Sequence, residues 1–140
     1  LLDWDRHKQL QTYFKTLNTV YKENKALYEV DFQWHGFEWV NCNDWEGSIL
    51  SFLRKSNDGS EVILVVANFT PTPRYNYKVG VPRHCNWKEI INSDATEFGG
   101  SGIGNFGGFW SDQIGWDNQP YSLNLNIPPL SVMMFKPTAD

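Results

Sequence analysis

Three close pairs of carboxylates are the residues of this chain whose types and spacing come nearest to catalysis. They are Asp3/Asp5, Asp44/Glu46 and Asp94/Glu97. Two carboxyl groups in one site can cleave a glycosidic bond, one as an acid and the other as a nucleophile or base. Each pair also has an ordinary explanation, since the first suits a helix N-terminus, the second a polar turn and the third a loop. None follows a strand in a context that would raise a carboxyl pKa, so we predict that this chain holds no catalytic residue.

A glycine-rich stretch at residues 92–108 contains Gly102-Ile-Gly-Asn-Phe-Gly107, which fits the dinucleotide-binding pattern G-x-G-x-x-G. That pattern holds a pyrophosphate only where a strand turns into a helix. Residues 108–115 follow here without helical periodicity and with a further glycine. We therefore predict no nucleotide cofactor. We expect the glycines to permit positive φ angles and close backbone packing in a long ordered loop.

The other chemistry-bearing residues have no partners at a useful spacing. The three histidines are His7, His35 and His84. No Cys or carboxylate stands at ligand spacing from them, so we predict no metal site. For Cys42 and Cys85 we predict two free thiols rather than a disulfide, because no secretion signal precedes them. Asn68-Phe-Thr70 is formally a glycosylation sequon, and without such a signal we assign it no function.

The composition argues against several classes of partner. The 140 residues carry 12 basic and 16 acidic side chains, a net charge of −4, which disfavours nucleic acid and anionic membranes. No apolar run approaches the length of a membrane-spanning helix. Aromatic residues make up 16% of the chain and include 7 Trp. Flat rings in such excess are typical either of a sugar-binding surface or of an aromatic-rich core.

The elements that would position these residues fall into two parts. Apolar residues at helical spacing, from Leu10 to Tyr21, predict one amphipathic helix over about residues 6–21, capped by Asp3 or Asp5. From Phe37 onward the period is two. The strands predicted from this alternation are 37–41, 48–54, 61–68, 75–79, 87–92, 121–127 and 131–136. Short strands broken by Gly and Pro predict a mainly β fold, an antiparallel β-sandwich that the helix precedes.

The same patterns predict which side chains are buried. Residues 56–60 predict a hairpin turn between two strands, and alternation assigns a core face to each strand. The residues expected to be mostly buried are Leu50, Phe52, Val62, Leu64, Val66, Leu123, Leu125 and Phe135. The helix is expected to leave its apolar stripe only partly covered within this chain. That stripe consists of Leu10, Tyr13, Phe14 and Leu17.

Several segments, in this order and at this spacing, resemble the C-terminal end of the 1,4-α-glucan (glycogen) branching enzymes. The most distinctive are Ala67-Asn-Phe-Thr-Pro-Thr-Pro-Arg74, Gly99-Gly-Ser-Gly-Ile-Gly-Asn105 and Leu123-Asn-Leu-Asn-Ile-Pro-Pro-Leu130. The remaining matching segments are residues 1–5, 17–22, 26–32, 36–39, 77–82 and 87–94. The likeness covers essentially the whole chain, which makes it more specific than any single motif.

The resemblance implies a fragment of an α-amylase-like enzyme that lacks the catalytic chemistry. The family transfers a segment of α-1,4-glucan to a 6-hydroxyl on a (β/α)8 barrel, by a retaining two-step mechanism. Its catalytic Asp, Glu and Asp would lie upstream of Leu1. Residues 1–36 would be the last helical segment of the barrel, and residues 37–140 a C-terminal sandwich that braces it. The resemblance also implies a cytoplasmic protein, without cofactors, whose partners are α-glucan chains and the missing barrel.

Two other functions fit the same residues: a free-standing starch- or glycogen-binding module and a purely structural β domain. Exposed coplanar Trp or Tyr rings would favour binding, and burial of every Trp would favour bracing. If glucan binds, we expect Trp39 and Trp34 to contact it, because they lie at the junction of helix and sandwich, where ligand grooves are common. The alternative is that Trp39 fills the core between the two parts.

Overall fold

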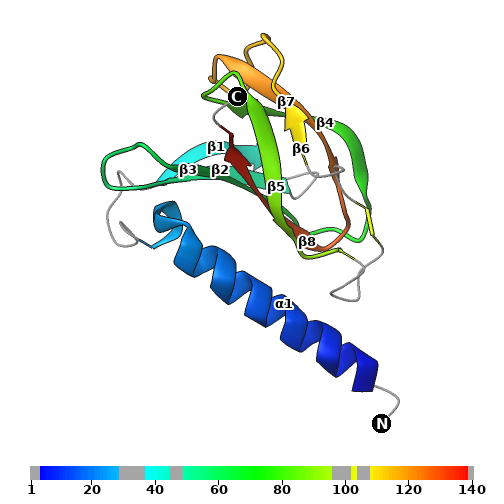
Figure 1. Cartoon of the computed structure of the whole chain (residues 1–140). Coiled ribbons are helices and arrows are strands. Elements are labelled where there is room, and N and C mark those ends of the chain that lie inside the picture. Colours follow the sequence, from blue (N-terminus) through cyan, green and yellow to red (C-terminus); the bar gives the residue numbers. More distant parts are fainter. Residues whose placement is uncertain (1–3, 29–36, 45–48, 96–101, 104–107, 139–140) are drawn as a thin grey trace.

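The computed structural model places one long helix beside two antiparallel sheets (Figure 1). It describes residues 4–28, 37–44, 49–95, 102–103 and 108–138, and for residues 4–7, 37, 39 and 41–44 it describes the backbone only. The elements are α1 Trp4–Glu23, a 3₁₀ helix η1 Lys25–Leu27, β1 Phe37–Asp44, β2 Ile49–Lys55, β3 Val62–Asn68, β4 Arg74–Val81, β5 Asn86–Asn92, β6 Gly108–Trp110, β7 Tyr121–Ile127 and β8 Ser131–Pro137. Among these residues the larger sheet has the strand order β1-β2-β3-β8-β5-β6, and the smaller sheet pairs β4 with β7.

The main core lies between the two sheets. Successive side chains of a strand point to opposite faces, so alternate residues of each strand enter this core. Trp87 and Met133 are fully buried there, facing Val79 of the smaller sheet. The prediction of burial is confirmed for Val62, Leu64, Val66, Leu123, Leu125 and Phe135.

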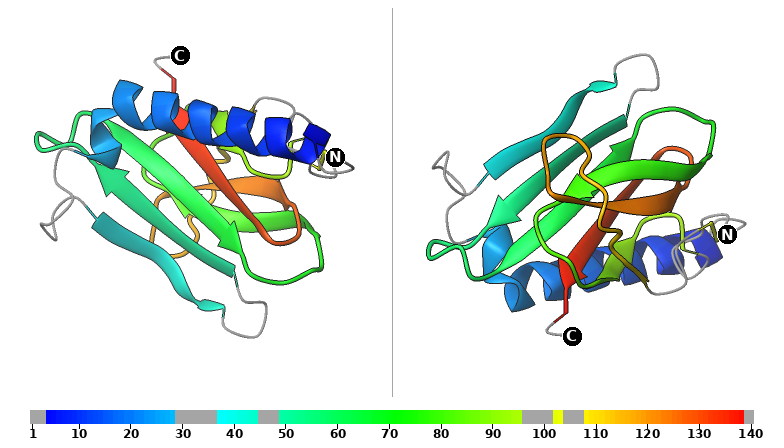
Figure 2. Two further views of the ribbon diagram at one scale, coloured as in Figure 1. Left: turned by 90° about the horizontal axis from the view of Figure 1, so that it is seen from below. Right: turned by 90° about the horizontal axis from the view of Figure 1, so that it is seen from above.

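A second core lies on the opposite face of the larger sheet, which α1 crosses (Figure 2). Its buried members come from the helical segment and from the sheet: Val20, Ala26, Leu27, Ile63, Val65 and Ile91. Every residue of β3 is therefore buried, because α1 covers one face of this strand and the smaller sheet covers the other. The near-continuous apolar run in β3 is typical of a strand with both faces covered.

The face assigned to β2 in the sequence analysis is wrong. Leu50 and Phe52 are only half-buried, and Phe52 packs against the cluster on the helix side. Ile49 and Leu53 point into the main core instead. β2 carries apolar residues at both odd and even positions, and both faces of its sheet meet other elements, so alternation does not identify the inner face.

The predicted strands are confirmed with small shifts at their ends, whereas β6 was not predicted. It is an edge strand of 3 residues that pairs with β5. Gly108 opens it at φ 143°, and a Cβ there would overlap the carbonyl oxygen of Trp87. Only glycine permits this close approach. Gly102 has φ 87°, so the expected use of these glycines is confirmed at both positions.

α1 is longer than predicted and leaves an apolar stripe uncovered by the described residues. Tyr13 and Leu17 pack against the sheet-side cluster. Leu10, Phe14 and Tyr21 lie on an adjacent face of the helix and are 50%, 54% and 44% exposed. The expected partial coverage of the helix stripe is thus confirmed. No helix in the described part of the chain is long and apolar enough to cross a bilayer.

Candidate functional site

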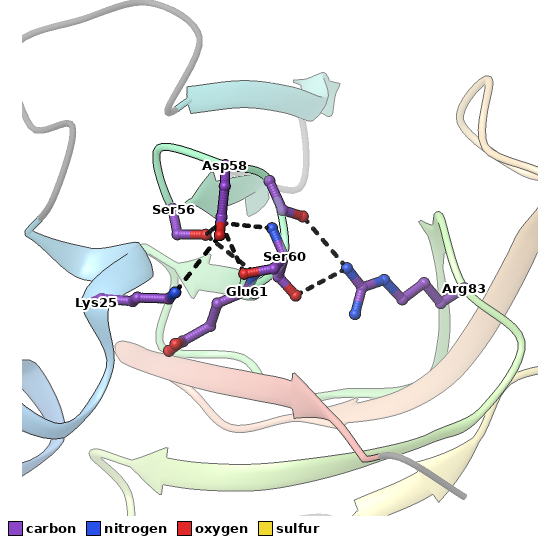
Figure 3. A network of polar contacts seen from close by, with 7 residues as sticks. Lys25, Ser56, Asp58, Ser60, Glu61 and Arg83 are labelled. Atoms are coloured by element: carbon purple, nitrogen blue, oxygen red, sulfur yellow. Dashed lines mark hydrogen bonds and ion pairs between the residues drawn. The ribbon is translucent and has the colours of Figure 1, made fainter.

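A polar network closes the turn between β2 and β3 (Figure 3). The Asp58 carboxylate accepts hydrogen bonds from Ser60 Oγ at 2.7 Å, Ser60 N at 3.0 Å and Ser56 Oγ at 2.8 Å. These bonds, led by those from Ser60, hold the pKa of Asp58 well below its usual range. Lys25 belongs to η1, and its Nζ lies 3.8 Å from Oδ2 of Asp58. Arg83 donates a hydrogen bond to the carbonyl oxygen of Ser60 at 3.2 Å. A carboxylate that stays charged is a poor general acid, so Asp58 is not suited to acid catalysis. Its hydrogen bonds join residues of one turn, and we assign the network a structural role there.

Asn68 is a second polar centre, and it is 2% exposed. Its Nδ2 donates to the carbonyl oxygens of Thr72 and Pro128, both at 3.0 Å. Its Oδ1 accepts from Thr70 N at 2.9 Å and from Thr70 Oγ1 at 2.7 Å. The amide of this sequon thus uses its donors and acceptor to tie the loop after β3 to the loop after β7, which is a structural role.

Asp94 is the member of the three carboxylate pairs whose side chain the structure describes. Its Oδ2 accepts from Ile103 N at 3.2 Å, and Asn92 Nδ2 donates to the Ile103 carbonyl at 2.8 Å. Asp94 therefore closes a loop. Of the other pair members, the structure describes only the backbone of Asp5 and Asp44, and the rest lie outside the described residues: Asp3, Glu46 and Glu97.

The remaining candidate residues, the histidines and cysteines, also form no reactive cluster in the part of the chain that the structure describes. In the described part of the chain, no three His, Cys, Asp or Glu side chains gather where they could hold a metal ion. Cys85 is a free and buried thiol, and burial raises its pKa. The side chain of Cys42 is not described.

An aromatic surface forms where residues 111–120, between β6 and β7, cross the outer face of the smaller sheet (Figure 1). We call this segment the strap. Asp112 and Ser122 of β7 exchange two backbone hydrogen bonds, at 2.7 and 3.1 Å. The residue of β4 opposite Ser122 is Gly80, which must therefore turn its N–H away from β7. Asp117 Oδ2 accepts that N–H at 3.2 Å, so the strap runs from the β7 edge to the β4 edge.

The strap lies directly on Gly80. A Cβ at this position would overlap the carbonyl oxygen of Trp116 and lie 2.9 Å from Cβ of Gln119. Trp116 and Gln119 close a tight turn through backbone hydrogen bonds of 3.0 and 2.9 Å. The two central residues, Asp117 and Asn118, have φ of 53° and 61°, as a type I′ turn requires.

Glu38 of β1 anchors the end of the strap. Its carboxylate accepts hydrogen bonds from Lys55 Nζ at 2.9 Å and from Gln119 Nε2 at 2.8 Å. The bond from Lys55 is the main cause that holds the pKa of Glu38 below its ordinary value, against the opposing effect of burial. The strap is thus attached to both sheets.

Two exposed indole rings lie in or next to the strap, with Trp116 inside it and Trp110 directly before it. Trp116 is 47% exposed, and Lys78 Nζ lies 4.9 Å from the centroid of its ring. Trp110, at the end of β6, is 58% exposed. Its ring meets His84 edge-on, with centroids 6.1 Å apart, and His84 in turn stacks on Tyr121 at 5.3 Å. Contacts with neighbouring side chains, Lys78 for Trp116 and His84 for Trp110, therefore orient both indoles.

The hydrogen bonds around Ser111 define the tautomer of His84. Ser111 Oγ lies 3.1 Å from the Arg83 carbonyl, which can only accept, so the single hydroxyl proton goes there. The hydroxyl oxygen then accepts from Cys85 N at 3.0 Å and from Nδ1–H of His84 at 3.2 Å. In a neutral ring Nε2 is consequently the acceptor, 3.4 Å from Gln113 Nε2.

Neither ring named in the sequence analysis belongs to the side chains that the structure describes. Trp34 is outside the described residues, and Trp39 has its backbone in β1 opposite Phe52, with a side chain that the structure does not describe. Sequence reasoning missed Trp110 and Trp116. The usable signal for Trp116 was its position in a stretch of Gly, Asp and Asn without alternation, where a Trp has no strand face to fill.

Comparisons with known proteins agree with this fold. Residues 39–138 match the family model of the alpha amylase C-terminal all-beta domain. The chain is similar to the 1,4-alpha-glucan branching enzyme GlgB of Aquifex aeolicus (strain VF5), with 54% identity over 136 residues, and to that of Halothermothrix orenii, with 47% over 137 residues. The alignments cover 97% and 98% of this chain and 22% of each relative, so the chain spans about a fifth of their length.

A solved structure supports the architecture independently. A mutant of the trehalulose synthase MUTB in complex with Tris matches with a TM-score of 0.53, over 89% of this chain and 17% of that chain. At 16% identity this likeness shows the fold alone, and it confirms the predicted mainly β, antiparallel architecture. Because the family model matches most of the sequence, the chain belongs to the family of α-amylase C-terminal all-beta domains.

Proposed function

We propose that this chain is the C-terminal part of a 1,4-α-glucan branching enzyme, in which it braces the catalytic domain. The observation that carries the proposal is the alignment of nearly the whole chain, helix included, with the Aquifex aeolicus enzyme at 54% identity. In this proposal residues 1–36 end the catalytic barrel, and residues 37–140 form the sandwich. The glucan substrate, the transfer reaction and a cytoplasmic location belong to the enzyme as a whole.

The surface of α1 supports a bracing role. Tyr13 and Leu17 attach one face of the helix to the larger sheet, while Leu10, Phe14 and Tyr21 present an adjacent apolar stripe to solvent. A contiguous apolar stripe of this kind is typical of a surface that another protein body covers. The catalytic domain would cover the stripe and so hold the sandwich in place.

A chimera tests the proposal. The segment of the Aquifex aeolicus enzyme that aligns with this chain is replaced by this chain, and branches formed in amylose are counted after debranching with isoamylase. We expect the chimera to branch amylose and the 140-residue chain alone to produce no α-1,6 linkages above a boiled control. A chimera that folds without branching activity, or an active chain alone, would contradict the proposal.

Two matched variants of the chimera test the bracing surface. Phe14→Lys places a charge on the uncovered stripe and should lower both branching activity and the thermal unfolding midpoint. Thr12→Lys adds the same charge to an exposed position on another face of α1 and should leave both unchanged. Equal behaviour of the two variants would show that the stripe does not contact the catalytic domain.

A free-standing glucan-binding module is the second candidate function, and the exposed Trp110 and Trp116 favour it. Trp39 and Trp34 stay proposed glucan contacts at the junction of helix and sandwich. Affinity electrophoresis of wild type and Trp39→Ala in glycogen gels tests them. Equal retardation of both proteins, with unchanged circular dichroism, would remove Trp39 from the proposal. A purely structural domain would not be retarded at all.

A further inference from the structure

We infer that the strap and the adjoining end of β6 form a binding site for α-1,4-glucan, in which Trp110 and Trp116 each stack on a glucose unit. The inference rests on the proposed function, which supplies the class of ligand. It places a glucan contact at residues 110–116, on rings other than those of Trp39 and Trp34.

The two indoles contribute little to the core of the sandwich. Trp87 is fully buried and fills that core, whereas Trp110 is 58% and Trp116 47% exposed. The stabilisation from an aromatic side chain grows with the apolar area that it removes from water. Both rings therefore keep about half of that area available for a ligand, and the planar face of an indole matches the apolar C–H face of a glucose ring.

Both rings are held before any ligand arrives. Trp116 sits in the type I′ turn on Gly80, with Lys78 over its ring. Trp110 pairs with Asn86 in the sheet and meets the edge of His84. A surface whose side chains are already ordered loses less conformational entropy on binding. That favours recognition of a flexible polymer, which must itself be ordered on the protein.

Hydrogen-bonding groups accompany the two rings: Asp112 and Gln113 belong to the strap, and His84 contacts the ring of Trp110. His84 presents Nε2 as an acceptor, and the Gln113 amide beside it carries both a donor and an acceptor. Asp112 is exposed, and its Oδ2 accepts a hydrogen bond from Asn124 at 2.8 Å. Amide, imidazole and carboxylate groups beside flat rings suit a ligand that is covered with hydroxyl groups.

The order of the layers leaves this surface free in the proposed enzyme. α1 covers one face of the larger sheet, the smaller sheet covers the other, and the strap crosses the outer face of the smaller sheet (Figure 1). A catalytic domain docked on the uncovered stripe of α1 would approach from the opposite side of the molecule. The strap would then remain open to a long polymer, which is why we assign the surface to glucan rather than to another protein body.

Calorimetric titration of the 140-residue chain with maltoheptaose tests the site. We expect binding, no binding of the β-1,4-linked cellohexaose, and at least about tenfold weaker binding for Trp110→Ala and for Trp116→Ala. About 55 Å² of apolar surface left in water corresponds to a tenfold change in affinity. Phe69→Ala is the matched control. It removes a ring that is 61% exposed beside Leu130, at the opposite end of β4 and β7, and should bind as wild type.

Two results would overturn the inference: no heat of binding for the wild type up to about 10 mM maltoheptaose, or wild-type affinity in both Trp variants with unchanged circular dichroism. If Trp116→Ala does not fold, Trp110→Ala and the ring-conserving Trp116→Phe carry the test. The latter should lose less affinity than Trp110→Ala. A branching chimera whose C-terminal chain binds no maltoheptaose would leave the proposed function intact and remove only this site.

Discussion

Gly80→Ala tests how the strap is seated on the smaller sheet. Gly80 lies within β4 and its φ is not positive, so alanine brings no backbone strain there. The added methyl group would overlap the backbone carbonyl of Trp116, and no side-chain rotation relieves a clash with backbone. The turn at Trp116 must therefore move away from the sheet. That movement breaks the bonds that join Asp117 to Gly80 and Gln119 to Glu38.

The expected loss of unfolding free energy is about 2–4 kcal/mol. Overpacking a filled site costs roughly 1–3 kcal/mol. The two broken hydrogen bonds add about 0.5–1.5 kcal/mol each, the partly exposed Gln119–Glu38 bond at the low end. Replacing glycine by alanine offsets about 0.4–1 kcal/mol, because the unfolded chain loses conformational freedom.

Urea unfolding followed by far-ultraviolet circular dichroism measures this loss, with Gly59→Ala as the control. Gly59 has φ 74° and open space around its Cα, so alanine there costs only the strain of a left-handed residue, about 1–2 kcal/mol. Gly80→Ala should also weaken maltoheptaose binding, whereas Gly59→Ala should not. A loss below about 0.5 kcal/mol for Gly80→Ala, with unchanged hydrogen exchange at position 80, would refute the described seating of the strap.

Three further predictions concern the core, a buried amide and an ion pair. Leu64→Ala should lower the unfolding free energy by about 2–5 kcal/mol, because the side chain is fully buried in the main core; a loss below about 0.5 kcal/mol in urea titrations would contradict that position. Asn68→Ala should cost about 2–4 kcal/mol in the same assay, because it removes the four hydrogen bonds of a buried amide, although the carbonyls of Thr72 and Pro128 keep the hydroxyls of Thr70 and Ser131 as donors; a near-neutral effect would contradict the structural role of this amide. The pKa of Glu38 is lowered by folding, so its ion pair with Lys55 stabilises the protein above the ordinary carboxyl pKa and this contribution is lost as the pH falls through the lowered value. The Glu38 side chain is 43% exposed, so the unfolding free energy of wild type should exceed that of Glu38→Gln by only a few tenths of a kcal/mol at about pH 7 and by less at about pH 3. A difference in unfolding free energy that grows on acidification would contradict this pH dependence.

Periodicity predicted the elements well where one side of an element is apolar. Leu123 and Leu125 alternate with polar residues in β7, and both enter the main core as expected. Helical spacing likewise predicted α1 and the partial coverage of its apolar stripe, of which Tyr13 and Leu17 pack on the sheet while Leu10 and Phe14 are exposed. The method failed for β2, because apolar residues occupy both of its faces and the sheet is covered on both sides.

Local sequence patterns do not predict how the strap is held on the sheet. The strap is held by backbone bonds and by the missing side chain of Gly80, a contact between segments far apart in the sequence. No alternation or helical spacing marks such a contact. The choice of Trp39 and Trp34 depended on the junction between helix and sandwich, whereas Trp110 and Trp116 depend on which residues the folded chain leaves uncovered.

The burial of β3 on both faces has a consequence for how this chain folds. Ile63 and Val65 belong to the core that α1 completes, while Leu64 and Val66, in the same strand, belong to the core between the sheets. Loss of either core would expose half of the central strand, so the two should melt together in a single cooperative transition. We therefore expect residues 1–36 and 37–140, divided by the boundary predicted from the sequence, to unfold together rather than as two separate units. A truncated chain that begins at Phe37 would present a bare sheet face to water and should aggregate rather than fold as a smaller sandwich.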